Sequence, residues 1–229
     1  MYAGEVSQWT ATIIERLGRV REFRLAREAD PDLLARVGAV KRFQHARFAR
    51  DYAALLADPR YAGAARFFLE ELYGPEDFAA RDAEFARVIP WMARLLPEDV
   101  MRMVADLIQL HALTEELDQQ MGAAIGSSDL DERSYRAAWR RVGRRVDRDR
   151  QLALLLAVGG ELERHTHSRV LATTLRLMRR PAQAAGLGRL QSFLETGLSA
   201  FTSMRGAREF LQAIELNEAK TIDALFAEK

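Results

Sequence analysis

Carboxylates and a histidine interrupt the apolar faces of several predicted helices, and these are the residues whose types could do chemistry. An imidazole beside carboxylates can bind a metal ion or transfer a proton when the groups share one helix face. In the segment HALTEELD, His111, Glu115 and Asp118 fall within the apolar stripe that Val104 and Ile108 define at helical spacing. We therefore predict that these three polar side chains face the interior.

The segment FFLEELYGPEDFAARD contains a second group of charges at predicted interior positions. On a helical wheel Glu71 lies on the same arc as Phe68, whereas its neighbour Glu70 points the opposite way. Arg81 lies inside the apolar stripe of the next predicted helix, and Asp82 lies at the edge of that stripe. The turn at GP would bring the two helices together, so Arg81 is the predicted partner of Glu71.

The last helix adds Glu218, which lies along the face of Phe210 and Ile214. Such a set could be a hydrogen-bonded network that enforces one packing arrangement, or a site for a metal ion or small ligand. The sequence leaves both interpretations open. The complete candidate set is Glu71, Arg81, Asp82, His111, Glu115, Asp118 and Glu218.

The familiar metal and nucleotide motifs are missing. Di-iron helical bundles use two Glu-x-x-His pairs, and this spacing does not occur in the chain. The segment ELERHTH offers Glu161 with His165 and Glu163 with His167, which could hold one surface metal or simply stabilise a helix end. There is no HExxH helix, no phosphate-binding glycine loop and no cysteine. We predict no cofactor.

The most basic segment, YRAAWRRVGRRVDRDR, covers residues 135–150 and includes Trp139. Arginines beside an aromatic residue are typical of nucleic-acid surfaces, but Asp147 and Asp149 dilute the charge and the net charge of the chain is only +1. We expect a solvated or partner-binding face here, and nucleic-acid binding is the weaker alternative. The candidate basic surface consists of Arg136, Arg140, Arg141, Arg144 and Arg145.

The elements that must position these residues all read as helices, because apolar residues recur at spacings of three and four and no run alternates with period two. Asp-Pro pairs at 30–31 and 58–59 are helix start signals, and Gly74–Pro75 is a stop. We predict an all-α single domain, 1–229, of nine or ten helices, with a possible internal boundary at the 126–131 loop. The predicted helices are 7–20 or longer, 31–57, 59–74, 75–96 with a kink or break near Pro90, 97–126, 131–142, 147–165, 168–179, 188–205 and 206–227.

Composition indicates a folded protein, with 48% hydrophobic and 29% charged residues. No apolar run approaches the length needed to cross a bilayer, and the first residues lack the features of a secretion signal. We expect a cytoplasmic protein that does not associate with membranes.

The stretch FFLEELYGPEDFAARDAEFARVIP resembles the defining motif of an uncharacterised, chiefly proteobacterial family of FFLEELY-motif proteins. The likeness continues through LHALTEELD, YRAAWRRVG and LRLMRRPAQAAGLGRLQSFLETG. The resemblance implies one all-helical unit, and it assigns no activity, ligand, partner or catalytic residue.

Three functions are therefore carried forward from the sequence. The first is a cytosolic, non-enzymatic helical protein that acts through an unknown protein partner or through self-association. The second is a metal- or small-ligand-dependent enzyme built on the Glu/His/Asp cluster. The third is weak nucleic-acid binding through the arginine-rich segment at 136–150.

Overall fold

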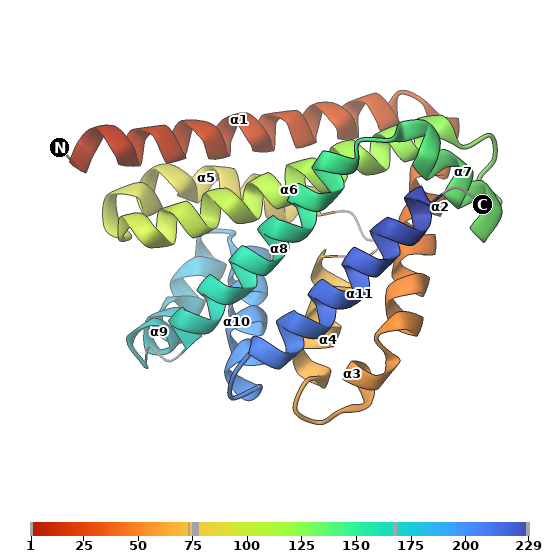
Figure 1. Cartoon of the computed structure of the whole chain (residues 1–229). Helices are drawn as coiled ribbons and strands as arrows, with labels where there is room; N and C mark the ends of the chain where they lie inside the picture. The colour runs from red at the N-terminus through yellow and green to blue at the C-terminus, as the bar shows by residue number, and fades with distance from the viewer. Residues whose placement is uncertain (1, 73, 75–77, 167–168, 228–229) are drawn as a thin grey trace.

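The chain folds into helices that surround one long central helix (Figure 1). The computed structural model describes the backbone of all residues except 1, 73, 75–77, 167–168 and 228–229, and it also leaves out the side chains of residues 2–8, 72, 95, 166, 169–172 and 174. The described part contains eleven α-helices, one π-helical turn and no strand, so the all-α class is confirmed and the helix count is slightly above the predicted nine or ten. The elements are α1 (Tyr2–Glu28), α2 (Pro31–Asp51), α3 (Ala53–Ala57), α4 (Ala62–Phe67), the π-turn η1 (Phe68–Leu72), α5 (Ala79–Leu95), α6 (Glu98–Ala124), α7 (Glu132–Val142), α8 (Arg145–Thr166), α9 (Arg169–Ala184), α10 (Gly188–Ser203) and α11 (Arg208–Phe226).

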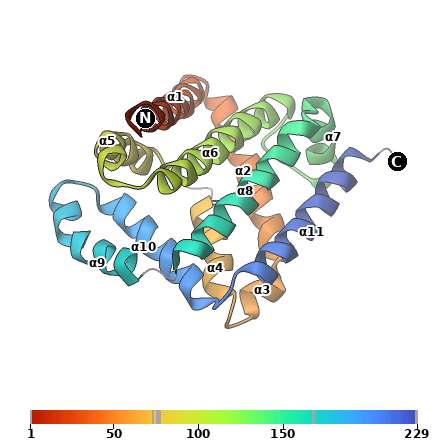
Figure 2. The same ribbon diagram turned by 60° about the vertical axis from the view of Figure 1, so that its left-hand side comes forward.

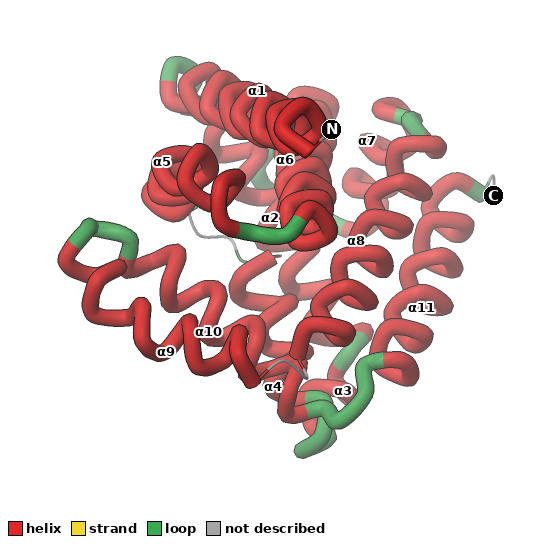
Figure 3. The backbone as a smooth tube through the Cα atoms, turned by 90° about the vertical axis from the view of Figure 1, so that its left-hand side faces the viewer, coloured by secondary structure: helices red, strands yellow, loops and turns green. Residues whose placement is uncertain are grey.

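Helix α6 is the centre of the arrangement. It packs against α1 along one side and against α2, α7 and α8 on others. Helix α5 packs on α1 and α10, and α11 packs on α7 and α8. Figure 2 shows α1, α5 and α6 running together at one side of the molecule, and Figure 3 shows the α9–α10 pair projecting on the side away from α11. Residues far apart in sequence therefore meet around α6.

The apolar core consists of three clusters rather than one continuous mass. The first, which includes Phe48, Phe68 and Phe210, joins α2, η1 and α11 with α8 and α10. The second joins α1, α5, α6 and α10 around Ile89. The third joins α2, α6, α7 and α11 around Tyr135, and it includes side chains from both sides of the 126–131 loop. Polar residues gather where these clusters meet.

Two helix starts follow directly from local chemistry. The Asp30 side chain accepts a hydrogen bond from the Leu33 N–H at 3.0 Å, and Pro31 occupies the first turn of α2 as predicted. The second Asp-Pro pair behaves differently. Asp58 accepts from the Arg60 N–H at 2.7 Å, which closes a tight turn, and α4 begins only at Ala62.

Two other predicted boundaries are wrong. Helix α2 ends at Asp51 rather than near residue 57, and α3 follows after Tyr52. Pro181 lies inside α9, where a break was predicted, and α5 continues past Pro90, where a kink or a break was predicted. Both prolines are exposed, so their rings do not disturb the buried face, and packing of that face holds each helix together.

Within the FFLEELY segment, Phe68–Leu72 form a π-helical turn instead of an ordinary helix. The turn is followed by Gly74, where a Cβ atom would lie 2.1 Å from the Glu70 carbonyl oxygen. Only glycine permits this close approach of the backbone. The turn directs Glu71 toward α5, which is the geometry on which the site depends.

Among the described helices, none has both the length and the apolar character that crossing a bilayer would require.

Candidate functional site

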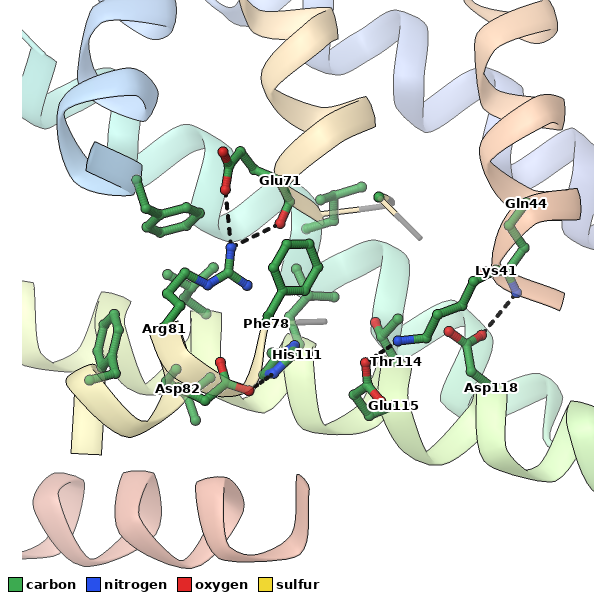
Figure 4. Close-up of a pocket in the computed structure, with 17 residues that line it drawn as sticks. Lys41, Gln44, Glu71, Phe78, Arg81, Asp82, His111, Thr114, Glu115 and Asp118 are labelled. Carbon is green, nitrogen blue, oxygen red and sulfur yellow. Dashed lines mark hydrogen bonds and ion pairs between the residues drawn. The ribbon is translucent and has the colours of Figure 1, made fainter. Parts of the chain in front are cut away.

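A polar cavity of about 60 Å³ lies where α2, η1, α5 and α6 meet, between the first and second apolar clusters. Six of the seven predicted residues line it, and Figure 4 shows how they are arranged. The polar lining consists of Lys41, Gln44, Glu71, Arg81, Asp82, His111, Thr114, Glu115 and Asp118. Apolar walls come from Phe78, Phe85, Leu107, Ile108, Leu110, Leu155 and Phe193.

At one end of the cavity Arg81 faces Glu71. Its Nη1 donates to the Glu71 carboxylate at 3.2 Å and to the Glu71 carbonyl oxygen at 3.1 Å. The guanidinium lies between two aromatic rings, 4.0 Å from the centroid of Phe78 and 4.6 Å from that of Phe193. Burial lowers the pKa of Arg81 despite the nearby carboxylates. Glu71 keeps 34% of its side chain exposed, so it lies at the rim rather than deep in the interior.

Asp82 and His111 form the next pair. Asp82 Oδ2 lies 3.0 Å from His111 Nε2 and accepts from Arg24 Nη2 at 2.9 Å. Burial acts to raise the pKa of Asp82, but the hydrogen bonds from His111 and Arg24 outweigh it, and the pKa is lowered. Asp82 is therefore a carboxylate acceptor that fixes the orientation of the imidazole.

Glu115 holds two cations from different helices. Its Oε2 accepts from Arg27 Nη2 at 2.7 Å, and its Oε1 accepts from Lys41 Nζ. The residue is only 4% exposed. Burial would raise the pKa of Glu115, yet the charges of Lys41 and Arg27 lower it to about 2. This carboxylate joins α1, α2 and α6.

Asp118 is the most deeply buried of the predicted carboxylates and is 2% exposed. Its Oδ1 accepts from Gln44 Nε2 at 2.9 Å. Burial raises the pKa of Asp118, and the nearby Lys41 only partly offsets this effect. Asp118 thus favours its protonated form more than an ordinary aspartate does.

The seventh predicted residue, Glu218, lies in a second cavity of about 40 Å³. Its two carboxylate oxygens accept from Arg47 Nη1 and Nη2 at 3.0 and 2.9 Å, and Tyr52 Oη donates to Oε1 at 2.8 Å. The structure therefore does not bring Glu218 into the cluster with His111, although the two cavities share Gln44 and Leu155 in their walls.

The donor set of the first cavity suits hydrogen bonding better than metal binding, because Asp82 and Glu115 each already face cations. Within the described residues no three His, Asp or Glu side chains form a group able to hold a metal ion. Glu161 of the ELERHTH segment pairs with Arg102 and Arg164 instead of with His165. The other pair of this segment, Glu163 with His167, lies partly outside the described residues.

The arginines of the basic segment make intramolecular contacts. Arg136 and Arg140 donate to the carbonyl oxygens of Ala224 and Leu225 at the end of α11, at 3.0 and 3.1 Å. Arg141 donates to the Ala124 carbonyl oxygen at the end of α6, at 3.2 Å. These guanidinium groups satisfy carbonyl groups that a helix end leaves without partners.

The remaining candidates of this segment form ion pairs. Arg144 pairs with Glu116 and Asp147, and Arg145 pairs with Asp149 and Asp223. The predicted basic surface is thus partly neutralised and partly used to fasten helix ends.

Comparison with protein families adds one finding to this geometry. A family model described as a domain of unknown function, DUF8198, matches residues 23–229. The chain belongs to the DUF8198 family. The match spans every residue that lines the two cavities. No curated protein and no solved structure matches the chain.

Sequence reasoning missed the three cations of this DUF8198 domain that contact Asp82 and Glu115, namely Arg24, Arg27 and Lys41. A signal for all three was present. Arg24 and Arg27 continue the stripe of Ile13, Leu17 and Val20 along α1 at the same three- and four-residue spacing. Lys41 occupies the corresponding place in α2, between Val37 and Gln44.

Measurements of stability can test the contrast between Glu70 and Glu71, the two glutamates of η1. Glu70 is exposed, whereas Glu71 pairs with a largely buried arginine. We expect Glu71→Ala to lower the free energy of unfolding by about 1 kcal/mol, because Arg81 loses its carboxylate partner. Glu70→Ala should change it by less than about 0.5 kcal/mol. Urea denaturation followed by circular dichroism measures both, and equal losses would mean that the two side chains do not differ in role.

Proposed function

We propose that the protein binds a small polar molecule in the cavity between α5 and α6. The observation that carries the proposal is the convergence of nine polar side chains from α2, η1, α5 and α6 on one cavity of about 60 Å³. A cavity of this size accommodates about four to six non-hydrogen atoms. Small-molecule sites combine apolar walls with a few placed polar groups, and they occur between the helices of bundles.

Two properties of the lining support binding over a purely structural role. Burying charged groups is unfavourable, and a core made only of apolar residues would avoid that penalty. In addition, several polar atoms of the lining retain hydrogen-bonding capacity within the described structure. Lys41 uses one of its three ammonium donors, and Arg81 uses one of its three nitrogen atoms.

A second candidate function is proton-transfer catalysis at the same site. His111 is oriented by Asp82 at 3.0 Å, which is the arrangement of a general base held by an acidic partner. Arg81 lies next to Asp82 in α5 and could hold an anionic group of a substrate. This observation favours a small-ligand enzyme over the metal-dependent form of that hypothesis.

Action through a protein partner or self-association stays a prediction. The most exposed large apolar side chains are distributed over six helices, with two on α1 and one on each of the others. They are Ile14, Leu25, Leu34, Trp91, Val146, Leu177 and Leu216.

Thermal shift measurements test ligand binding. A ligand present at about 100 times its Kd stabilises the native state by about 2.7 kcal/mol, which raises Tm by about 5 to 10 °C for a chain of this size. We expect such a shift with at least one member of a panel of short carboxylates, amino acids, polyols, inorganic phosphate and divalent metal ions.

A matched pair of variants locates the effect. Thr114→Met fills the cavity, and Ala123→Met places the same side chain on the exposed side of α6. The active ligand should shift Tm for wild type and Ala123→Met but not for Thr114→Met. A panel without any shift, or the same shift in all three proteins, would contradict the proposal.

A further inference from the structure

The guanidinium of Arg81 is the most unusual group in the cavity. Its side chain is 11% exposed, and the rings of Phe78 and Phe193 lie 4.0 and 4.6 Å from it. Stacking against aromatic rings leaves only the edges of the guanidinium plane for hydrogen bonding. The position of this group is therefore set by packing before any ligand arrives.

One edge of the guanidinium plane makes no hydrogen bond among the described residues. Nη1 is occupied by the carbonyl and carboxylate oxygens of Glu71. Among the described residues, no hydrogen bond of Arg81 uses Nε or Nη2, and neither atom is fully buried. These two nitrogen atoms carry parallel N–H groups whose spacing matches the two oxygens of a carboxylate.

An acceptor lies at the same end of the cavity. Asp82 follows Arg81 in α5 and contacts His111 Nε2 at 3.0 Å, so the imidazole and the guanidinium lie close to one carboxylate (Figure 4). A carboxylate can only accept, so Nε2 carries the proton in this pair. In the neutral imidazole Nδ1 then carries a lone pair, and it makes no hydrogen bond among the described residues.

The charged residues around the Arg81 end of the cavity favour a ligand with a single negative charge. Each nearby carboxylate already has a cationic partner within the described structure. These pairs are Glu71 with Arg81, Asp82 with Arg24, and Glu115 with Arg27 and Lys41. A dianion such as phosphate would meet more repulsion from these acids than a monoanion would. A ligand ammonium group would meet repulsion from Arg81 and Lys41.

We infer that the cavity binds a short 2-hydroxycarboxylate, whose carboxylate pairs with Nε and Nη2 of Arg81 and whose hydroxyl donates to His111 Nδ1. Glycolate and lactate, with five and six non-hydrogen atoms, represent this class, and their size suits a cavity of about 60 Å³. The inference rests on the proposed function and names its ligand class.

Isothermal titration calorimetry of the full chain with sodium glycolate, acetate, glycine and inorganic phosphate tests the assignment. Glycolate should bind wild type at least about tenfold more tightly than acetate, because acetate has no hydroxyl for His111. Arg81→Lys keeps the positive charge but lacks the two parallel N–H groups that pair with a carboxylate. It should weaken glycolate binding at least about tenfold. Arg94→Lys makes the same change at an exposed position of α5 and should leave the affinity unchanged.

The variant His111→Gln tests the second contact, in which the ligand hydroxyl donates to His111 Nδ1. In this variant the preference for glycolate over acetate should fall to about twofold or less. Circular dichroism and Tm of each variant verify that it is folded before titration.

Three results would overturn the inference. They are equal glycolate affinity of Arg81→Lys and Arg94→Lys, tighter binding of glycine or phosphate than of glycolate, and no glycolate binding to wild type at millimolar concentration. If another compound of the thermal shift panel raises the Tm of wild type but not that of Thr114→Met, the proposed function stands and only the ligand class is wrong. If no compound of the panel raises the Tm of wild type, both the proposed function and the ligand class are wrong.

Discussion

Replacing Glu115 by glutamine is expected to lower the free energy of unfolding by about 3 to 5 kcal/mol at pH 7. The reason is that Arg27 and Lys41 would both lose the carboxylate that holds them, while Arg27 is only 5% exposed. A buried cation without a partner must either remain poorly solvated or draw the end of α1 away from α6. Glu116→Gln is the matched control, since Glu116 pairs with Arg144 and Arg19 nearer the surface, and its loss should be below about 1 kcal/mol.

The effect should depend on pH in a defined direction. The pKa of Glu115 is lowered on folding from 4.5 to about 2. A group whose pKa is depressed in the folded state stabilises the protein above its ordinary pKa, and this stabilisation is lost as the pH falls toward the folded value. The lowered pKa corresponds to about 3 kcal/mol at neutral pH.

Urea denaturation at several pH values between 7 and about 3 measures this linkage. The stability difference between wild type and Glu115→Gln should narrow below pH 4.5. Asp118 acts in the opposite sense, because burial raises its pKa and its contribution declines as the pH rises above its ordinary value. The comparison at each pH therefore uses the difference from wild type. A difference that stays constant down to the lowest pH would contradict the assigned role of Glu115.

Replacing Gly122 by alanine is expected to lower the free energy of unfolding by about 2 to 3 kcal/mol, although alanine is the better helix former. A Cβ atom at this position would lie 2.4 Å from Val37 Cγ2 and 3.1 Å from the Val37 backbone nitrogen. The overlap with Val37 Cγ2 is the closer of the two contacts, and relieving it requires α2 and α6 to move apart. Because Lys41 and Asp118 lie one turn away on these helices, their separation would also disturb the cavity.

Two comparisons isolate the steric cause. In a Val37→Ala background, Gly122→Ala should add less than about 1 kcal/mol, since the closest atom has been removed. Gly160→Ala, in α8, has no atom within 4 Å of the added Cβ and should leave stability unchanged or raise it by up to about 1 kcal/mol. A loss at Gly122 that is the same with and without the Val37 methyl groups would contradict helix contact as the cause.

The prediction of individual elements succeeded where a local signal decides the structure. Asp30 and Pro31 start α2 because a side-chain oxygen and a fixed φ angle satisfy the first turn without any tertiary contact. It failed at Pro181, because packing of the buried face outweighs the local penalty of an exposed proline. It also failed at Phe68–Leu72, where the backbone winds as a π-helical turn that no local sequence signal predicts.

The candidate site was predicted in part from helix faces. The wheel placed His111, Glu115 and Asp118 on one face of α6, and all three line the same cavity. It could not show that Glu218 belongs to a different cavity, because sequence spacing gives the face of a helix but not the neighbour that faces it. Partners such as Arg24 and Arg27 depend on how α1 crosses α5 and α6.

The sequence by itself determined that the chain is helical and that carboxylates such as Glu115 and Asp118 lie on buried helix faces, since both follow from a period of 3.6 residues. Only the tertiary structure decided which cation meets each carboxylate and that a cavity remains between them. Those outcomes depend on the crossing of helices and on contacts between residues up to 171 positions apart, such as Arg47 with Glu218. Local periodicity carries no information about such contacts, because the packing of whole helices sets them.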